Sequence, residues 1–116
     1  KTCELISSTE NILINFDKEA RRNKKKPVIA IMPTGLDIQY FLNYGTWPNQ
    51  PLLDALQSAK TPFINIGDGI PKNMPTKNPC DLFDNCNAHF NETGYALVAK
   101  VVHERLQKLV SDVSVP

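Results

Sequence analysis

Val28-Ile29-Ala30-Ile31-Met32 is a run of apolar residues with no polar residue between them. A strand with one solvent-exposed face alternates polar and apolar side chains, whereas an unbroken apolar run indicates a strand that is covered on both faces. Such strands are typical of parallel sheets with helices packed on both sides. Pro33, Thr34 and Gly35 follow directly and predict a turn where the strand ends.

Amphipathic segments on both sides of this run predict helices. Over residues 4–22, apolar and small side chains recur at the three- and four-residue steps of one helix face. The predicted face consists of Leu5, Thr9, Ile12, Leu13, Phe16 and Ala20. Residues 36–51 predict a short helix and a long loop. Residues 51–60 predict a further helix, with Pro51 in its first turn and a buried side made of Leu52, Leu53 and Leu56.

A second strand and a last helix complete the pattern. Residues 63–66 predict the strand, which the sequence Gly67-Asp68-Gly69 closes. Residues 70–88 are rich in proline and show little periodicity, so they predict a loop. Asn91 is a suitable N-cap for the last helix. Its predicted buried stripe consists of Tyr95, Val98, Ala99, Val102, Leu106 and Leu109.

The order of helix, strand, helix, strand, helix predicts an α/β fold. The expected architecture is a three-layer αβα arrangement around a doubly wound parallel sheet of the flavodoxin-like kind. Two strands cannot cover three apolar helices or satisfy their own edges. We therefore expect residues 1–116 to form a single α/β unit that is the C-terminal part of a larger domain, or whose sheet a partner chain completes.

The composition is that of an ordinary globular protein, with 41% hydrophobic and 22% charged residues. A net charge of +1 gives the whole molecule no bias toward nucleic acid or anionic membranes, and no apolar run is long enough to cross a bilayer. Residues 21–26 hold five of the 13 basic residues. A solvated helix end, where the macrodipole favours cations, is the preferred interpretation over contact with phosphate.

Three cysteines allow at most one internal disulfide. Cys80 and Cys86 could bridge across the loop that precedes His89, or they could remain free thiols, and the sequence favours neither. Two cysteines and one histidine at this spacing match no standard zinc site. The sequence predicts no metal and no cofactor.

His89 stands in the stretch Asp84-Asn-Cys-Asn-Ala-His89-Phe-Asn-Glu-Thr-Gly94-Tyr-Ala-Leu-Val-Ala99, immediately before the last helix. A histidine on a loop at the mouth of a helix is well placed for proton transfer, because the ring can reach a cleft while the helix holds its backbone. A capping or surface role is the competing interpretation. His103 lies beside the apolar stripe of the same helix and is interpreted as a boundary residue.

The block from His89 to Ala99 resembles the last conserved block of the SGNH (GDSL-type) hydrolases, which are serine esterases and acyltransferases on an αβα fold. Members of that family carry Asp-x-x-His, followed by Asn and by a glycine that opens the final helix. Further similarities are an apolar strand that ends in Pro33-Thr34, an aromatic-rich loop, a helix that opens at Pro51 and a strand that ends near Asp68. The resemblance covers most of the chain.

The resemblance implies that His89 is the general base, which takes the proton of a serine hydroxyl and returns it to the leaving alcohol. The family has its orienting acid three residues earlier, but that position is Cys86 here. Asp84, five residues before His89, is the nearest acid, and a two-residue bulge in the loop would bring it into line. Asp81 is the reserve candidate.

The sequence lacks the rest of the family's machinery. The Gly-Asp-Ser block with the nucleophile and the Gly-x-Asn-Asp block with an oxyanion donor are both absent. The serines, none of which is expected on a strand-to-helix elbow, are Ser7, Ser8, Ser58, Ser111 and Ser114. Since one oxyanion donor is often worth roughly 3–4 kcal/mol, the isolated chain should be inactive.

The sequence thus predicts the C-terminal part of a serine esterase that acts on an ester or acylated small molecule or carbohydrate. Acyl transfer at the same site is chemically adjacent to this function. Two rival functions are a non-catalytic α/β binding or interaction module, and a basic module that contacts nucleic acid or anionic surfaces through residues 21–26. The aromatic residues that could line an acyl pocket, but that are better explained as core cover, are Tyr40, Phe41, Tyr44 and Trp47.

Overall fold

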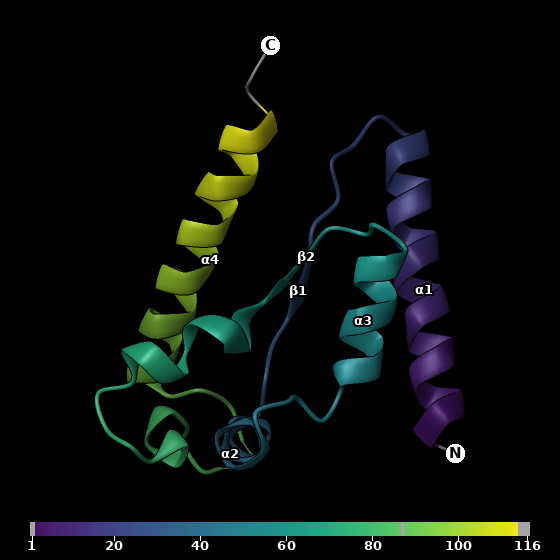
Figure 1. Ribbon diagram of the computed structural model, residues 1–116. Coiled ribbons are helices and arrows are strands. Elements are labelled where there is room, and N and C mark those ends of the chain that lie inside the picture. Colours follow the sequence, from purple (N-terminus) through teal and green to yellow (C-terminus); the bar gives the residue numbers. More distant parts are fainter. Residues whose placement is uncertain (1, 87, 114–116) are drawn as a thin grey trace.

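The computed structural model describes residues 2–86 and 88–113, with side chains described for residues 7–86 and 88–111 (Figure 1). The helices and strands are α1 (Thr2–Arg22), β1 (Ile29–Ile31), α2 (Gly35–Tyr44), α3 (Gln50–Ser58), β2 (Phe63–Asn65) and α4 (Glu92–Val113). Three short 3-10 turns, η1 (Ile66–Gly69), η2 (Pro71–Asn73) and η3 (Pro79–Leu82), lie between β2 and α4. The predicted helices and strands are present, with two helices, α2 and α3, between the strands.

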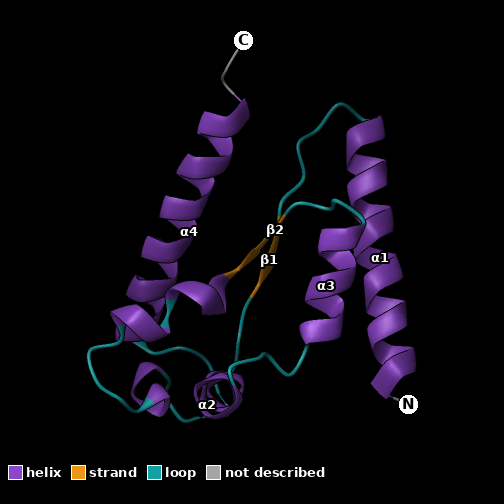
Figure 2. Ribbon diagram, viewed as in Figure 1, coloured by secondary structure: helices purple, strands orange, loops and turns teal. Residues whose placement is uncertain are grey.

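The two strands pair in parallel, with Ile29 opposite Phe63, Ala30 opposite Ile64 and Ile31 opposite Asn65. Helices flank this pair on both sides, with α4 on one side and α1 and α3 on the other (Figure 2). The described residues hold these two strands in one sheet. Two strands do not define a strand order, so the flavodoxin-like sheet stays a prediction.

The carboxyl ends of both strands lie at the same end of the molecule. β1 leads into α2, β2 leads into η1, and α4 begins near this end and runs back alongside the sheet (Figure 1). α1 and α3 each run opposite to the strand that follows them, as helices in crossover connections do (Figure 1). The loop with His89 therefore meets the strand ends rather than the strand beginnings.

α2 is longer and more regular than the short helix that the sequence predicted. The Thr34 hydroxyl accepts a hydrogen bond from the backbone N–H of Asp37 at 3.1 Å, and the Asp37 carboxylate accepts one from the N–H of Thr34 at 2.9 Å. This capping box satisfies two backbone donors at the start of the helix. Gly45, with a φ of 76°, ends the helix in the left-handed conformation.

The core lies between the sheet, α2, α3, the 3-10 turns after β2 and the first half of α4. The side chains with less than 2% exposure are Ile38, Leu56, Ile64, Ile66, Ile70 and Leu82. From α4 the core receives Leu97, Val98 and Val101, and the half-buried Val102 and Leu109 pack against it. The predicted stripe is thus confirmed for Val98, Val102 and Leu109, and the rest of it is rotated. Tyr95, Ala99 and Leu106 of the predicted stripe are exposed. The rotation follows from the close approach of Val101 to Gly69, where an added Cβ would lie 2.7 Å from a Val101 methyl carbon.

α1 also differs from its predicted face. Ile12 and Phe16 are exposed, whereas Asp17 is buried and accepts a 2.9 Å hydrogen bond from the Nε of Arg21. The helix packs mainly on α3 and turns the Asp17 side inward. Leu5 of the predicted face lies outside the residues with described side chains. The amphipathic pattern therefore predicted the helix but not the side that α3 covers.

The aromatic residues of α2 and the following loop divide between core and surface. Phe41 stacks on Trp47 with 4.4 Å between ring centroids, and the buried Trp47 donates its Nε1 proton to the Asp68 carboxylate at 3.0 Å. Tyr40 and Tyr44 are exposed. The interpretation as core cover is therefore confirmed for Phe41 and Trp47 and wrong for Tyr40 and Tyr44. In the part of the chain that the structure describes, no helix combines the length and apolar character needed to cross a membrane.

Thr34→Ala tests the capping box. The substitution should lower the free energy of unfolding by about 1 kcal/mol, because the Asp37 N–H loses its acceptor. A fall in the thermal midpoint of roughly 4 °C, measured by circular dichroism, is the expected result. Thr34→Ser, which keeps the hydroxyl, should retain most of the stability. Equal losses in the two variants would mean that the hydroxyl does not cap α2.

Candidate active site

His89 lies on a loop whose two ends are joined through the backbone. Phe83 and Phe90 form an isolated antiparallel bridge, and the backbone N–H of Asp84 donates to the carbonyl oxygen of His89 at 2.9 Å. The rings of Phe83 and Phe90 stack beneath this bridge at 4.3 Å between centroids, and both are buried. The chain from Asp84 to His89 is therefore a closed loop on an apolar base.

A disulfide between Cys80 and Cys86 fastens the same loop to η3. The sequence favoured neither a bridge nor free thiols, and the structure has the bridge. Its Cys86 end packs on the start of α2, because a Cβ added to Gly35 would lie 2.8 Å from the Cys86 Sγ and 2.9 Å from the Cys86 carbonyl oxygen. Gly35 directly follows the turn after β1, so the loop is held at the carboxyl end of that strand.

The side chain of Asn91 joins the loop to α4. Its Oδ1 accepts a 2.9 Å hydrogen bond from the N–H of Gly94, which confirms Asn91 as the helix cap. Its Nδ2 donates to the carbonyl oxygens of Asp81 at 2.7 Å and Phe83 at 3.3 Å. The backbone N–H of Asn91 donates to the Leu82 carbonyl oxygen at 2.9 Å. The sequence predicted the cap but not the hydrogen bonds from Asn91 to Asp81 and Phe83. These bonds depend on how the loop before α4 folds back beside the helix.

Gly94 allows the first turn of α4 to lie directly on this segment. A Cβ at this position would overlap the carbonyl oxygen of Leu82, and it would also lie 2.7 Å from the Phe90 ring. Backbone cannot move aside as a flexible side chain can. The glycine of the sequence block is thus required here for the close approach of a helix to a loop.

The structure brings Asp84 and His89 together through their backbones, and both side chains are exposed. Among the described side chains, the His89 ring makes no hydrogen bond or ion pair with Asp84 or Asp81. Asp81 accepts a 2.7 Å hydrogen bond from the Thr76 hydroxyl, so its carboxylate has another partner. Catalytic hydrogen bonds often tighten only when substrate is bound, so the roles of His89 and Asp84 stay predictions.

None of the described serines lies at the ends of the strands. Ser7 and Ser8 are in α1, Ser58 is the last residue of α3, and Ser111 is near the end of α4. Ser114 lies outside the described residues, as does the side chain of Cys3. The described part of the chain therefore places no serine hydroxyl beside the His89 loop.

The other candidate groups lie away from this loop. The basic residues 21–26 are all exposed, and Arg22 pairs with Glu19 at 3.0 Å. His103 is exposed on α4. Within residues 2–86 and 88–113, no three metal-binding side chains gather closely enough to hold an ion.

No family model, no curated protein and no solved structure matches this chain. The function is therefore inferred from the residues of the loop and from their place at the strand ends.

Asn91→Ser separates the two roles of the Asn91 side chain. Serine keeps an oxygen that can accept from the Gly94 N–H but loses the donors to Asp81 and Phe83. We expect faster amide hydrogen exchange in residues 84–89 of this variant, while the first turn of α4 stays protected. Asn91→Ala should unprotect both segments and cost roughly 2 kcal/mol of stability. Identical exchange in the two variants would contradict separate roles.

Reduction of the Cys80–Cys86 disulfide should loosen the loop without unfolding the core. For so short a closed loop, chain entropy predicts a loss of roughly 2 kcal/mol. Thermal melts with and without dithiothreitol measure this loss. The Cys80→Ser/Cys86→Ser variant, in which dithiothreitol should have no further effect, is the control. An unchanged midpoint on reduction of the parent chain would show that the bridge does not constrain the fold.

Proposed function

We propose that residues 1–116 supply the general base of an SGNH-type serine ester hydrolase whose nucleophile lies outside these residues. The observation that carries the proposal is the exposed imidazole of His89 on a loop that is tethered at the carboxyl ends of parallel strands. In open α/β sheets, ligands bind in the crevice outside the carboxyl ends of the strands. The tether is also what proton transfer requires, because it fixes the backbone of the base.

The proposed reaction is acyl transfer through a covalent intermediate. His89 takes the proton of a serine hydroxyl as the serine oxygen attacks the ester carbonyl, and it then protonates the leaving alcohol. Water next attacks the acyl-serine as His89 takes its proton. The bond between the acyl group and the serine oxygen then breaks, His89 returns the proton to that oxygen, and the acyl group leaves as the carboxylic acid. The substrate class is an ester or acylated small molecule or carbohydrate. No cofactor enters any of these steps.

Asp84 is the proposed orienting acid. The hydrogen bond between its N–H and the His89 carbonyl keeps the two residues opposite one another, and rotation of two exposed side chains would bring carboxylate and ring together. A carboxylate on the Nδ1 proton fixes the tautomer in which the other nitrogen can accept a proton. Asp81 is less suited, because Thr76 already donates to it.

The nucleophile and the oxyanion donors are proposed to come from polypeptide that also completes the sheet. This polypeptide is either an N-terminal segment or a partner chain. Transfer of the acyl group to an alcohol instead of water uses the same residues, so acyltransferase activity is part of the same proposal.

A non-catalytic α/β binding module is the second candidate. The observation that favours it is that the described side chains place neither a carboxylate partner nor a serine hydroxyl on the His89 ring. The module needs no such contacts. A basic module that contacts phosphate gains no similar support, since Arg21 and Arg22 pair with acids of their own helix.

His89→Ala is the direct test, made in the full-length polypeptide that contains these residues. Hydrolysis of p-nitrophenyl acetate should fall at least about 1,000-fold in kcat, because the serine loses its base. His103→Ala is the matched control, since it removes an exposed histidine of α4 and should change the rate less than twofold. Retained turnover in His89→Ala would remove His89 from the mechanism.

Asp84→Asn and Asp81→Asn form the second pair of variants. We expect a loss of at least about 100-fold for Asp84→Asn and little change for Asp81→Asn. The reverse order would assign the acid to Asp81. If the parent polypeptide has no hydrolase or acyltransferase activity, the binding module is the better account.

A further inference from the structure

The outer edge of β1 has no partner strand among the described residues. In a parallel pair, the N–H and C=O groups of alternate residues point to opposite edges. The N–H of Ile29 donates to the Pro62 carbonyl oxygen at 3.2 Å, so Ile29 and Ile31 face β2 and Ala30 faces outward. Ala30 is also exposed, although it lies in the middle of the strand. Unpaired backbone groups at such an edge are a template for another strand.

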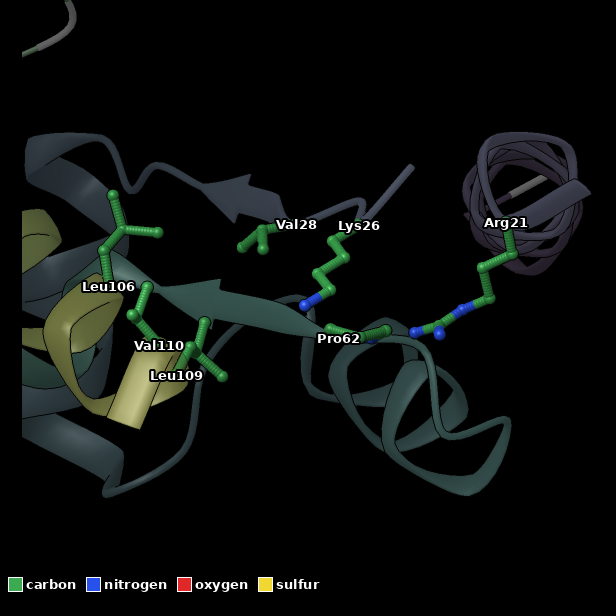
Figure 3. A pocket seen from close by; sticks show the side chains of 7 residues that line it. All are labelled: Arg21, Lys26, Val28, Pro62, Leu106, Leu109 and Val110. Carbon is green, nitrogen blue, oxygen red and sulfur yellow. The ribbon is translucent and has the colours of Figure 1, made fainter. Parts of the chain in front are cut away.

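Uncovered apolar side chains flank this edge on the α4 side. Val28 and Met32 are 37% and 50% exposed, and the period of a strand places them on one face together with Ala30. Across from Val28, Leu106, Leu109 and Val110 of α4 line the other wall of an open groove of about 400 Å³ (Figure 3). Val110 is 65% exposed. Pro62 and the basic side chains of Arg21 and Lys26 line the rest of the groove. Between β1 and α4 this face of the sheet is therefore apolar but unfinished.

A second uncovered apolar surface lies on α1. Ile12 is 67% exposed and Phe16 is 51% exposed, because α1 packs mainly on α3. Figure 3, which looks along the helices, shows α1 on the β1 side of the molecule and α3 on the β2 side. A helix that enters a strand through a right-handed crossover covers that strand and its neighbour. α1 is therefore placed beside the position that a strand beyond β1 would occupy.

We propose that the free edge of β1 binds an apolar β-strand that lies outside residues 1–116 and runs parallel to β1. The added strand would pair with the backbone of Ala30, lie under Ile12 and Phe16 of α1, and meet Leu106 and Val110 of α4 on its other face. This proposal deepens the proposed function. It rests on that function in one respect, because both require polypeptide outside residues 1–116 to complete the active site.

Two observations favour a strand over other occupants. An apolar small molecule could fill the groove but would leave the N–H and C=O of Ala30 unpaired, which a strand would satisfy. Apolar surfaces on both sides of one edge match an apolar strand, which would be covered on both faces there. A parallel direction would bring the carboxyl end of the added strand to the same end of the molecule as the His89 loop.

Selection of peptides on the purified chain tests the proposal. The probe is a displayed library of ten-residue peptides whose central five positions are drawn from Val, Ile, Leu, Phe, Ala and Thr. Enriched peptides are then measured by fluorescence anisotropy. Ala30→Pro removes the outward N–H but none of the bonds to β2, so it should weaken binding at least tenfold.

Two polar substitutions test the flanking surfaces. Met32→Lys and Phe16→Glu change exposed side chains, so they should leave the thermal midpoint of the chain unchanged but weaken peptide binding at least tenfold. Leu42→Lys is the matched control, because Leu42 is 48% exposed on α2 and lies outside the proposed surface. It should bind the peptides as the parent does.

Binding by His89→Ala separates this inference from the proposed function. That variant should bind the peptides normally. If the full-length protein binds them but has neither hydrolase nor acyltransferase activity, the proposed function is overturned and the docking edge stands. Three results would overturn the docking edge itself. They are failure to enrich any peptide, binding that is indifferent to Ala30→Pro and Met32→Lys, and a concentration-dependent dimer that Ala30→Pro abolishes, which would assign the edge to a second copy.

Discussion

The side chain of Asn91 is the constraint on which the candidate site depends. It caps α4 through the Gly94 N–H and holds the returning loop through the carbonyl oxygens of Asp81 and Phe83. This one side chain satisfies a backbone N–H and two backbone carbonyl oxygens. The position of His89 relative to the helix follows from these bonds, because only Phe90 separates the two residues.

The disulfide and the capping network act on different sides of the same loop. Cys86 anchors it against Gly35 at the start of α2, and Asn91 anchors it against α4. β1 leads into α2, so the loop is fixed to the strand end on one side and to the last helix on the other. Exposed side chains on a fixed backbone are the arrangement expected where a protein must present a reactive group to a ligand.

The sequence predicted the elements well and their contacts less well. The apolar run at residues 28–32 and the Asn91 cap follow local rules, so they could be found from the chain alone. The capping box from Thr34 to Asp37 is a local pattern too, and it would have predicted where α2 begins. The buried Asp17 and the rotated face of α4 could not be found, because they depend on which neighbour each helix meets. Whether the imidazole meets a carboxylate depends on rotamers of exposed side chains, which no sequence pattern determines.

The amide nitrogen of Asn91 has a consequence for glycan attachment. Asn91-Glu92-Thr93 is an acceptor sequence for N-linked glycosylation, and the sugar would replace one hydrogen of Nδ2. That nitrogen donates to two carbonyl oxygens, so both hydrogens are already in use. An oligosaccharide at Asn91 would therefore remove one of the two hydrogen bonds by which this side chain holds the loop.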